Sequence, residues 1–473
     1  MTTQTSPDTK RISPLTTIRK ALFEGEQQDF TKGSMRRAVV LLAVPMIIEM
    51  GMESVFALVD LFFVGKLGPH AVSTIGLTES VLTIIYSLAI GGSMAATALV
   101  ARRVGEKNPA QAAETAMQVI LIGVAVMLVV SVVGLLLAPN ILGMMGAEPE
   151  TIRIGTPYIR IMMGSSTFIA LLFLINGIFR GAGDASIAMK SLTLANICNI
   201  ILCPVLIRGI GPFPELGLAG AALATSIGRG IGVGYQFWHL FNGRGVVKLT
   251  AAKVRAKWDM IKTVLSVAWP ATLQFVIASC SWVFLAKLVA ETGGHNASAG
   301  YQIAIRLVVF FILPAWGISN AAATLVGQNL GAKNPDRAEA AVWKTVKYNM
   351  IFMASVSLIF LLATRPLIGF FTKDAAVAEI GVESLRIISA GYVFYGMGMV
   401  LVNAFNGAGD TKTPTIINFF GFWLFQIPFA YLLAKPLGMG PTGVFIAIPV
   451  AETAINFVAL AMFRRGKWKT IKV

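Results

Sequence analysis

Long apolar runs are the feature that most limits what this chain can fold into. Of its 473 residues, 56% are hydrophobic and only 13% are charged, whereas a soluble protein carries about 25% charged residues. The runs recur along the whole sequence and reach about 20 residues, the length that an α-helix needs to cross a bilayer. The sequence therefore predicts an all-α polytopic membrane protein.

Hydropathy divides the apolar runs into about twelve predicted spans. They lie at 36–62, 72–100, 114–138, 155–179, 187–208 and 217–241, and at 259–290, 297–326, 343–363, 383–405, 413–434 and 442–463. The predicted organisation is an N-terminal tail, a six-helix half, a basic linker, a second six-helix half and a basic tail, at 1–35, 36–241, 242–258, 259–463 and 464–473.

Two motifs recur at one spacing and indicate an internal repeat. "LVARRVGEKNPAQAAE" begins at Leu99, and its second copy, "LVGQNLGAKNPDRAEA", begins at Leu325. "FRGAGD" ends at Asp184, and "FNGAGD" ends at Asp410, so both pairs are separated by the same offset along the chain. Because each half holds an even number of spans, both halves enter the membrane from the same side. We expect pseudo-symmetric bundles related by an axis along the membrane normal.

The placement of basic residues predicts the orientation. Most Lys and Arg fall on the tails and the even-numbered loops, so the positive-inside rule favours cytoplasmic termini in the cell (inner) membrane. The stretch from the first residue through Gly33 has no apolar core, which argues against a cleavable signal peptide. The net charge of +16 then reflects topology, and we expect the lipid bilayer rather than nucleic acid as partner.

Motifs for catalysis or cofactor binding are missing from the sequence. The three cysteines and three histidines form no metal-ligand spacing, and no nucleophile elbow, phosphate-binding loop or dinucleotide fingerprint occurs. We therefore expect no enzyme activity, no metal site and no cofactor. The chain is expected to act as a monomer.

Together, the duplicated motifs and an Asp-containing first span, "VDLFFVGKLG", resemble the MATE family of multidrug and toxic-compound extrusion transporters. The resemblance covers nearly the whole chain after about residue 35. It implies secondary active antiport, in which cationic or amphipathic compounds leave while protons or sodium ions enter. The duplicated loops also have a simpler interpretation, as turn chemistry at helix ends.

Three carboxylates interrupt the apolar first span within "EMGMESVFALVD". At about 100° per residue, Glu53 lies about 40° from Glu49 and Asp60 lies about 20° from Glu49, so all three share one helix face. Each charge costs about 2.5–3.5 kcal/mol at the centre of a membrane helix, so this face should line a wet cavity and take up cations. Alternatively, Glu49 and Glu53 only form interior hydrogen bonds between helices.

Other positions are carried over from the resemblance one at a time. Asp60 matches the family's coupling aspartate, and the fourth-, fifth- and sixth-span polar positions match Asn176, Asn199 and Thr225. The resemblance implies a place for these residues in the substrate and cation cavity. Interhelical hydrogen bonding is the alternative role for the last three.

The departures from the family's pattern bear on the coupling ion. Cys203 stands where the fifth span usually has an aspartate, and Ala278 and Tyr395 stand where one branch has an acidic pair. Glu452 is then the deep carboxylate of the second half. Sodium prefers oxygen ligands, so we expect coupling in the first half and favour H+ over Na+ as coupling ion.

Two arginines inside predicted spans keep a second function open. Arg229 is positioned to pair with the acidic face, and Arg306 lies in an apolar context of the eighth span. We assign both to the predicted cavity. A flippase for lipid-linked oligosaccharide or peptidoglycan precursors would use such cations to bind pyrophosphate, so it remains the alternative. Glu79 is either a further cavity acid or an interfacial residue.

Overall fold

The regular structure of the described residues is helical throughout. The computed structural model describes residues 14–24, 29–242, 245–250 and 255–473. The helices are α1 (Pro14–Arg19), α2 (Met35–Val64), α3 (Pro69–Gly105), α4 (Pro109–Met144), α5 (Pro149–Gly164), α6 (Ser166–Ala182), α7 (Ala185–Arg208), α8 (Gly217–Phe241), α9 (Trp258–Gly331), α10 (Pro335–Phe371), α11 (Ala375–Ser389), α12 (Tyr392–Ala408), α13 (Lys412–Asn418), α14 (Ile427–Ala434) and α15 (Pro441–Arg464). Several begin at a proline, whose missing N–H and fixed φ suit the first helical position.

The number of spans depends on how three helical segments are counted. Among the described residues, nine helices are long and apolar enough to cross a membrane, or ten if the bent pair α11 and α12 forms one span. Helix α9 has 74 residues and would be about 110 Å long if straight, far more than a bilayer's thickness. It breaks at Gly294 (φ 70°, ψ −159°), between the predicted seventh and eighth spans. Helix α8 coincides with the predicted sixth span but is not among the nine helices counted; it contains several glycines and Arg229.

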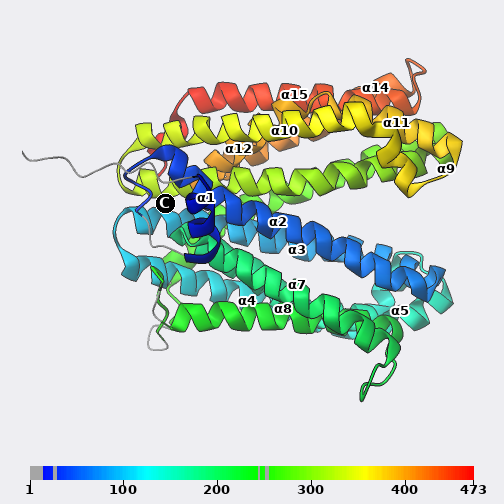
Figure 1. Cartoon of the computed structure of the whole chain (residues 1–473), viewed down its shortest axis with the longest axis horizontal. Coiled ribbons are helices and arrows are strands. Elements are labelled where there is room, and N and C mark those ends of the chain that lie inside the picture. The colour runs from blue at the N-terminus through cyan, green and yellow to red at the C-terminus, as the bar shows by residue number, and fades with distance from the viewer. Residues whose placement is uncertain (1–13, 25–28, 243–244, 251–254) are drawn as a thin grey trace, which may run out of the picture.

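The helices form two bundles, α2–α8 and α9–α15 (Figure 1). The bundles lie close together at the end that carries α1 and the C-terminus, and they diverge toward the other end (Figure 1). Helices α2 and α3 of the first bundle pack against α9 of the second. The predicted fold class is confirmed as an all-helical membrane protein.

The two repeated loops adopt the same local geometry. Lys107 and Lys333 are the non-glycine residues with positive φ, at 58° and 57°, among the described residues. The asparagine that follows each lysine caps the next helix: Asn108 Oδ1 accepts from the backbone N–H of Gln111, and Asn334 Oδ1 from that of Arg337, both at 3.1 Å. The repeated sequence therefore codes for one turn, used twice.

At the end where the bundles lie close together, the contact between α3 and α9 depends on two glycines at equivalent positions of the repeat. A Cβ at Gly105 of α3 would collide with the carbonyl of Gln328 on α9, and a Cβ at Gly331 of α9 would collide with the carbonyl of Arg102 on α3. The offset of the repeat relates Gly105 to Gly331 and Arg102 to Gln328. The absence of side chains at both glycines lets the two helices cross backbone to backbone.

The C-terminal segment ties the two bundles together at this end. Arg102 of α3 donates from Nη2 to the carbonyl of Ile471 at 2.9 Å. Lys469, close before Ile471 in the chain, pairs with Glu339 of α10. The last residues of the chain therefore contact both halves.

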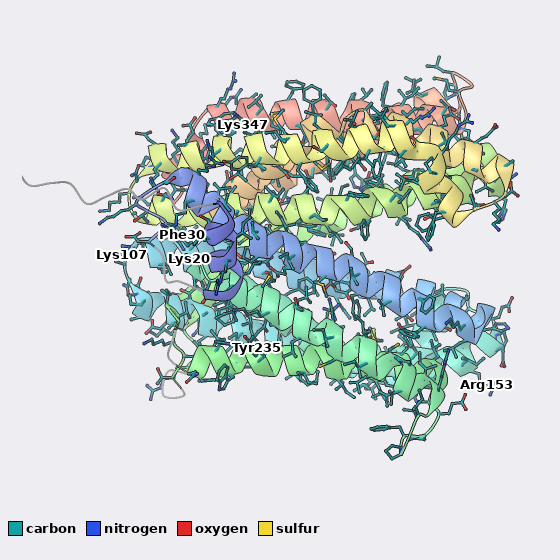
Figure 2. All side chains as sticks on the ribbon, viewed as in Figure 1. Lys20, Phe30, Lys107, Arg153, Tyr235 and Lys347 are labelled. Atoms are coloured by element: carbon teal, nitrogen blue, oxygen red, sulfur yellow. The ribbon has the colours of Figure 1, made fainter. Side chains whose placement is uncertain are left out.

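A segment before α2 makes the same kind of connection. Asp29 pairs with Lys107 of the first half at 2.8 Å, and Arg337 of the second half donates to the carbonyl of Lys32 at 2.8 Å. Phe30 is buried between these contacts, and it lies at the same end of the molecule as Lys107 (Figure 2). Two peptide segments thus hold the bundles together where they meet.

Candidate functional site

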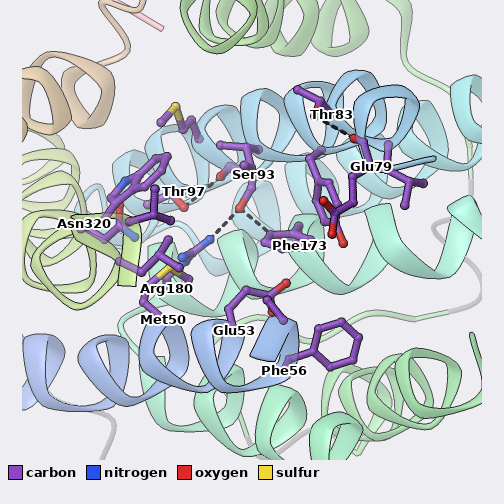
Figure 3. A pocket seen from close by; sticks show the side chains of 18 of the residues that line it. Met50, Glu53, Phe56, Glu79, Thr83, Ser93, Thr97, Phe173, Arg180 and Asn320 are labelled. Atoms are coloured by element: carbon purple, nitrogen blue, oxygen red, sulfur yellow. Dashed lines mark hydrogen bonds between the residues drawn. The ribbon is translucent and has the colours of Figure 1, made fainter. Parts of the chain in front are cut away.

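A cavity of about 470 Å³ opens between the two halves. Its walls come from α2, α3, α5 and α6 of the first half and from α9 and α12 of the second. The lining is mostly apolar and aromatic, with charged and amide side chains at Glu53, Glu79, Arg180, Asn320, Asn403 and Asn406. Figure 3 shows Glu53, Glu79 and Arg180 around this space.

Glu53 of the acidic face lines the cavity and is paired. Arg229 of α8 donates from Nη2 to Glu53 Oε1 at 2.8 Å, and its side chain is only 2% exposed. The guanidinium also lies 4.8 Å from the ring centre of Phe56 and 3.4 Å from Tyr86 Oη. The pairing expected between Arg229 and the acidic face is thus present in the structure.

Glu49, one turn before Glu53, is buried behind the cavity wall. Its side chain is 1% exposed, and Arg180 of α6 lies 3.7 Å from its Oε1. Asn176 of α6 donates to the same oxygen at 2.8 Å. Arg180 reaches the cavity and donates to Ser93 Oγ of α3 at 2.7 Å (Figure 3). Glu49 and Glu53 therefore each have an arginine as counter-charge, as charges inside a bundle require.

The predicted cavity amides and hydroxyl lie within the first bundle. Asn176 accepts from Gln236 at 2.6 Å in addition to its bond with Glu49. Asn199 donates to Thr225 Oγ1 at 3.0 Å, and both are buried. None of these residues is among the described lining residues. Asn176 supports Glu49 from behind, and Asn199 and Thr225 join α7 to α8.

The second predicted arginine lies outside the cavity. Arg306 of α9 is exposed, and the described lining does not include it. The positive charge of Arg306 attracts the carboxylate of Glu79 on α3. Glu79 lines the cavity and is also exposed. Glu79 is therefore a cavity acid near the opening, with an arginine of the opposite half nearby.

Asp60 belongs to α2 by its backbone, but its side chain lies outside the described part of the structure. Its predicted role in cation coupling stays a prediction. Cys203 of α7 is fully buried. No group of three His, Cys, Asp or Glu side chains that could hold a metal occurs within the described residues.

Sequence reasoning missed Arg180 and the amides of the second half. Arg180 lies in the repeated motif "FRGAGD", where Asn406 takes its place in the second copy. The interpretation of that motif as turn chemistry holds for its glycine, which adopts positive φ, 89° at Gly183 and 86° at Gly409. Arg180 lies in the last turn of α6, where a basic residue is common because it interacts favourably with the helix dipole, so its sequence position did not single it out.

Comparisons with known proteins agree in family and fold. The MatE family profile matches residues 45–205 and 270–432. The chain is 27% identical to the probable multidrug resistance protein NorM of Thermotoga maritima, over 96% of this chain and 97% of that protein. It is 25% identical to the FAD transporter of Shewanella oneidensis, over 91% and 94%. A solved structure described as the outward-facing conformation of a multidrug resistance MATE family transporter superposes with a TM-score of 0.88 at 25% identity, covering 94% of this chain and 98% of that one.

Proposed function

The chain belongs to the MatE family of multidrug efflux transporters, and we propose that it exports cationic or amphipathic compounds in exchange for protons. The observation that carries this proposal is the cavity between the halves, which combines an apolar, aromatic lining with the carboxylate of Glu53. An adaptable apolar cavity suits substrates of varied shape, and a carboxylate in its wall favours a cationic group.

The arrangement of charges supports protons over sodium as the coupling ion. Glu49 and Glu53 have a guanidinium nitrogen at 3.7 Å and 2.8 Å, so a sodium ion would have to displace or share that counter-charge. A proton needs only one oxygen lone pair and abolishes the carboxylate's charge. Cys203 removes an oxygen donor that the family pattern often places nearby, and sodium prefers oxygen ligands.

Proton uptake then has a direct structural consequence. Protonation of Glu53 removes the negative charge 2.8 Å from Arg229 and so changes the balance of charge around this buried guanidinium. Its rearrangement moves α8 relative to α2, whose Pro45 gives the helix a place to bend. In this proposal, alternating access switches the protein between two states. In the described state the cavity is open where the bundles diverge; in the other state that end closes and the cavity opens at the opposite end, where α3 and α9 now cross at Gly105 and Gly331.

We also propose that both termini lie in the cytoplasm. The positive-inside rule favours this orientation, and the diverging end of the bundles then faces outward.

Arg180 favours a second candidate class, substrates with an anionic group. It is the cation of the described cavity lining, and a relative is named as an FAD transporter. Arg229 is held by Glu53, and Arg306 lies outside the described lining. The case for a lipid-precursor flippase, which also binds phosphate groups, therefore rests on Arg180.

The test is transport by the purified chain in proteoliposomes. Export of a cationic dye should follow an imposed proton gradient and should not respond to a sodium gradient of equal size. Asp60→Asn, the family's coupling position, should abolish export while the protein still inserts. Transport driven by sodium alone would overturn the proposed ion, and transport of a dinucleotide but no cationic dye would favour the second candidate. Wild-type export rates in Asp60→Asn would remove that residue from the mechanism.

A further inference from the structure

The second half holds a buried carboxylate that the mechanism above does not use. Glu452 of α15 is 7% exposed and lines a cavity of about 20 Å³ that is separate from the large one. This volume is enough for one water molecule. No hydrogen bond or opposite charge from the described residues acts on the carboxylate. An ionised carboxylate in this place would be a buried, uncompensated charge, which is costly.

The small cavity lies at a break between two helices. Helices α11 and α12 are bent by 55° at a short break, and Gly391 in this break packs so closely on Pro449 of α15 that a Cβ would lie 2.8 Å from that ring. Glu452 lies one turn beyond Pro449, so it faces the break. Broken helices with unsatisfied polar groups are where membrane transporters build ion sites.

The repeat shows that this carboxylate replaces a simple hydrogen bond. The offset of the repeat relates Glu452 and Gly391 to Ser226 and Ser165 of the first half. Ser165 lies in the break between α5 and α6, and the two hydroxyls are 2.6 Å apart. The first half thus closes its break with a pair of hydroxyls. In the second half, a glycine and a glutamate take their places and leave a cavity.

The groups that face Glu452 are neutral. The titratable residues of the described cavity lining, besides Glu452, are Tyr392 and Tyr395 of α12. Tyr392 Oη is buried and has no hydrogen-bond partner within the described structure, and Tyr395 interacts electrostatically with Glu452. From α9, α11 and α15 the lining contributes apolar side chains at Trp282, Val308, Ile312, Ile388, Ile448 and Pro449. Arg386 of α11 instead donates to Thr364, at 3.3 Å.

We propose that Glu452 is a second proton-binding site, located in the C-terminal half and separate from the cavity between the halves. In the described packing the carboxyl is protonated, because nothing compensates its charge. It donates this proton to water when the break between α11 and α12 opens. Tyr392 and Tyr395 line the same small cavity, so their hydroxyls are the candidate partners for the carboxyl or for a water molecule there.

Infrared difference spectroscopy of the reconstituted protein, recorded between acid and alkaline pH, tests this proposal without transport. We expect a carbonyl band of a protonated carboxylic acid in a dry environment, which disappears as pH rises. The band should be lost in Glu452→Gln and in Glu452→Ser, the residue that the first half has at this position. It should persist in Glu53→Gln, which changes the other site. Wild-type thermal unfolding of each variant shows that it is folded.

Two results would overturn the proposal. The first is an unchanged band in both Glu452 variants. The second is a loss of the band on adding sodium at constant pH, which would make the site a metal-cation site. If neither Glu452 variant folds, Tyr395→Phe decides, because it keeps the carboxyl and changes its neighbour. The band should then shift in frequency, and an unshifted band would place the protonated acid elsewhere.

Discussion

The two halves share one helical plan but differ in what they bury. The first half pairs Glu49 with Arg180 and Glu53 with Arg229 inside the bundle. At the repeat positions of the two arginines the second half has Asn406 and Ile455. When the two halves are aligned on the helix prolines Pro45 and Pro270, Gln274 and Ala278 occupy the positions equivalent to Glu49 and Glu53.

Buried charge is not needed to build such a bundle, as the second half demonstrates. Asn406 and Gln274 are buried there and are neutral. A buried ion pair often stabilises no more than well-packed apolar residues would, because desolvation offsets its attraction. Under the proposed function, the charged pairs of the first half serve cation exchange rather than stability.

The largest effect should come from removing one member of a pair. Arg229→Ile leaves Glu53 as an uncompensated carboxylate and should destabilise the protein by about 3–5 kcal/mol, measured by denaturant unfolding in detergent. The double variant Arg229→Ile with Glu53→Ala carries the residues of the second half and should recover most of that loss. A double variant as unstable as the single one would show that the guanidinium stabilises through packing.

An intermediate effect is expected for Glu49→Gln, which gives the first half the amide found at Gln274. The substitution keeps an acceptor for Asn176 but removes the charge facing Arg180. A hydrogen bond to a charged group contributes about 1.5–3 kcal/mol and a neutral one about 0.5–1.5 kcal/mol, so the unfolding free energy should fall by about the difference, 1–2 kcal/mol. Gln274→Ala is the matched control in the second half and should cost less. Equal losses would mean that the charge at Glu49 contributes nothing.

The smallest effect is expected at the repeated turns, where the two halves have the same asparagine cap. Asn108→Ala and Asn334→Ala each remove the side-chain acceptor at a helix N-terminus and should each cost about 1 kcal/mol. The two costs should be equal, since both bonds measure 3.1 Å. Thermal unfolding of the two variants side by side checks this, and clearly unequal shifts would show that the halves contribute differently to the measured transition.

Much of the fold was predictable because its causes are local. Helix α8, Gly217–Phe241, has the bounds predicted from hydropathy, and the repeated lysine and glycine turns follow from side-chain chemistry within a few residues. Breaks inside a predicted span were harder: hydropathy separated the spans on either side of Gly294, but the break at Ser165 between α5 and α6 lies within the predicted span 155–179 and is invisible to a hydropathy average. The acidic face of α2 was also predictable, because the periodicity of a helix puts Glu49 and Glu53 on one side.

Local sequence alone specifies a helical membrane protein with an internal repeat, capped turns and carboxylates on one face of its first span. Which cation each carboxylate faces depends instead on tertiary packing. Glu49 and Glu53 lie on α2, whereas Arg180 lies on α6 and Arg229 on α8. Such pairings depend on how helices from distant parts of the chain pack together, whereas hydropathy and turn chemistry act over a few residues. The same packing left Glu452 alone beside a broken helix.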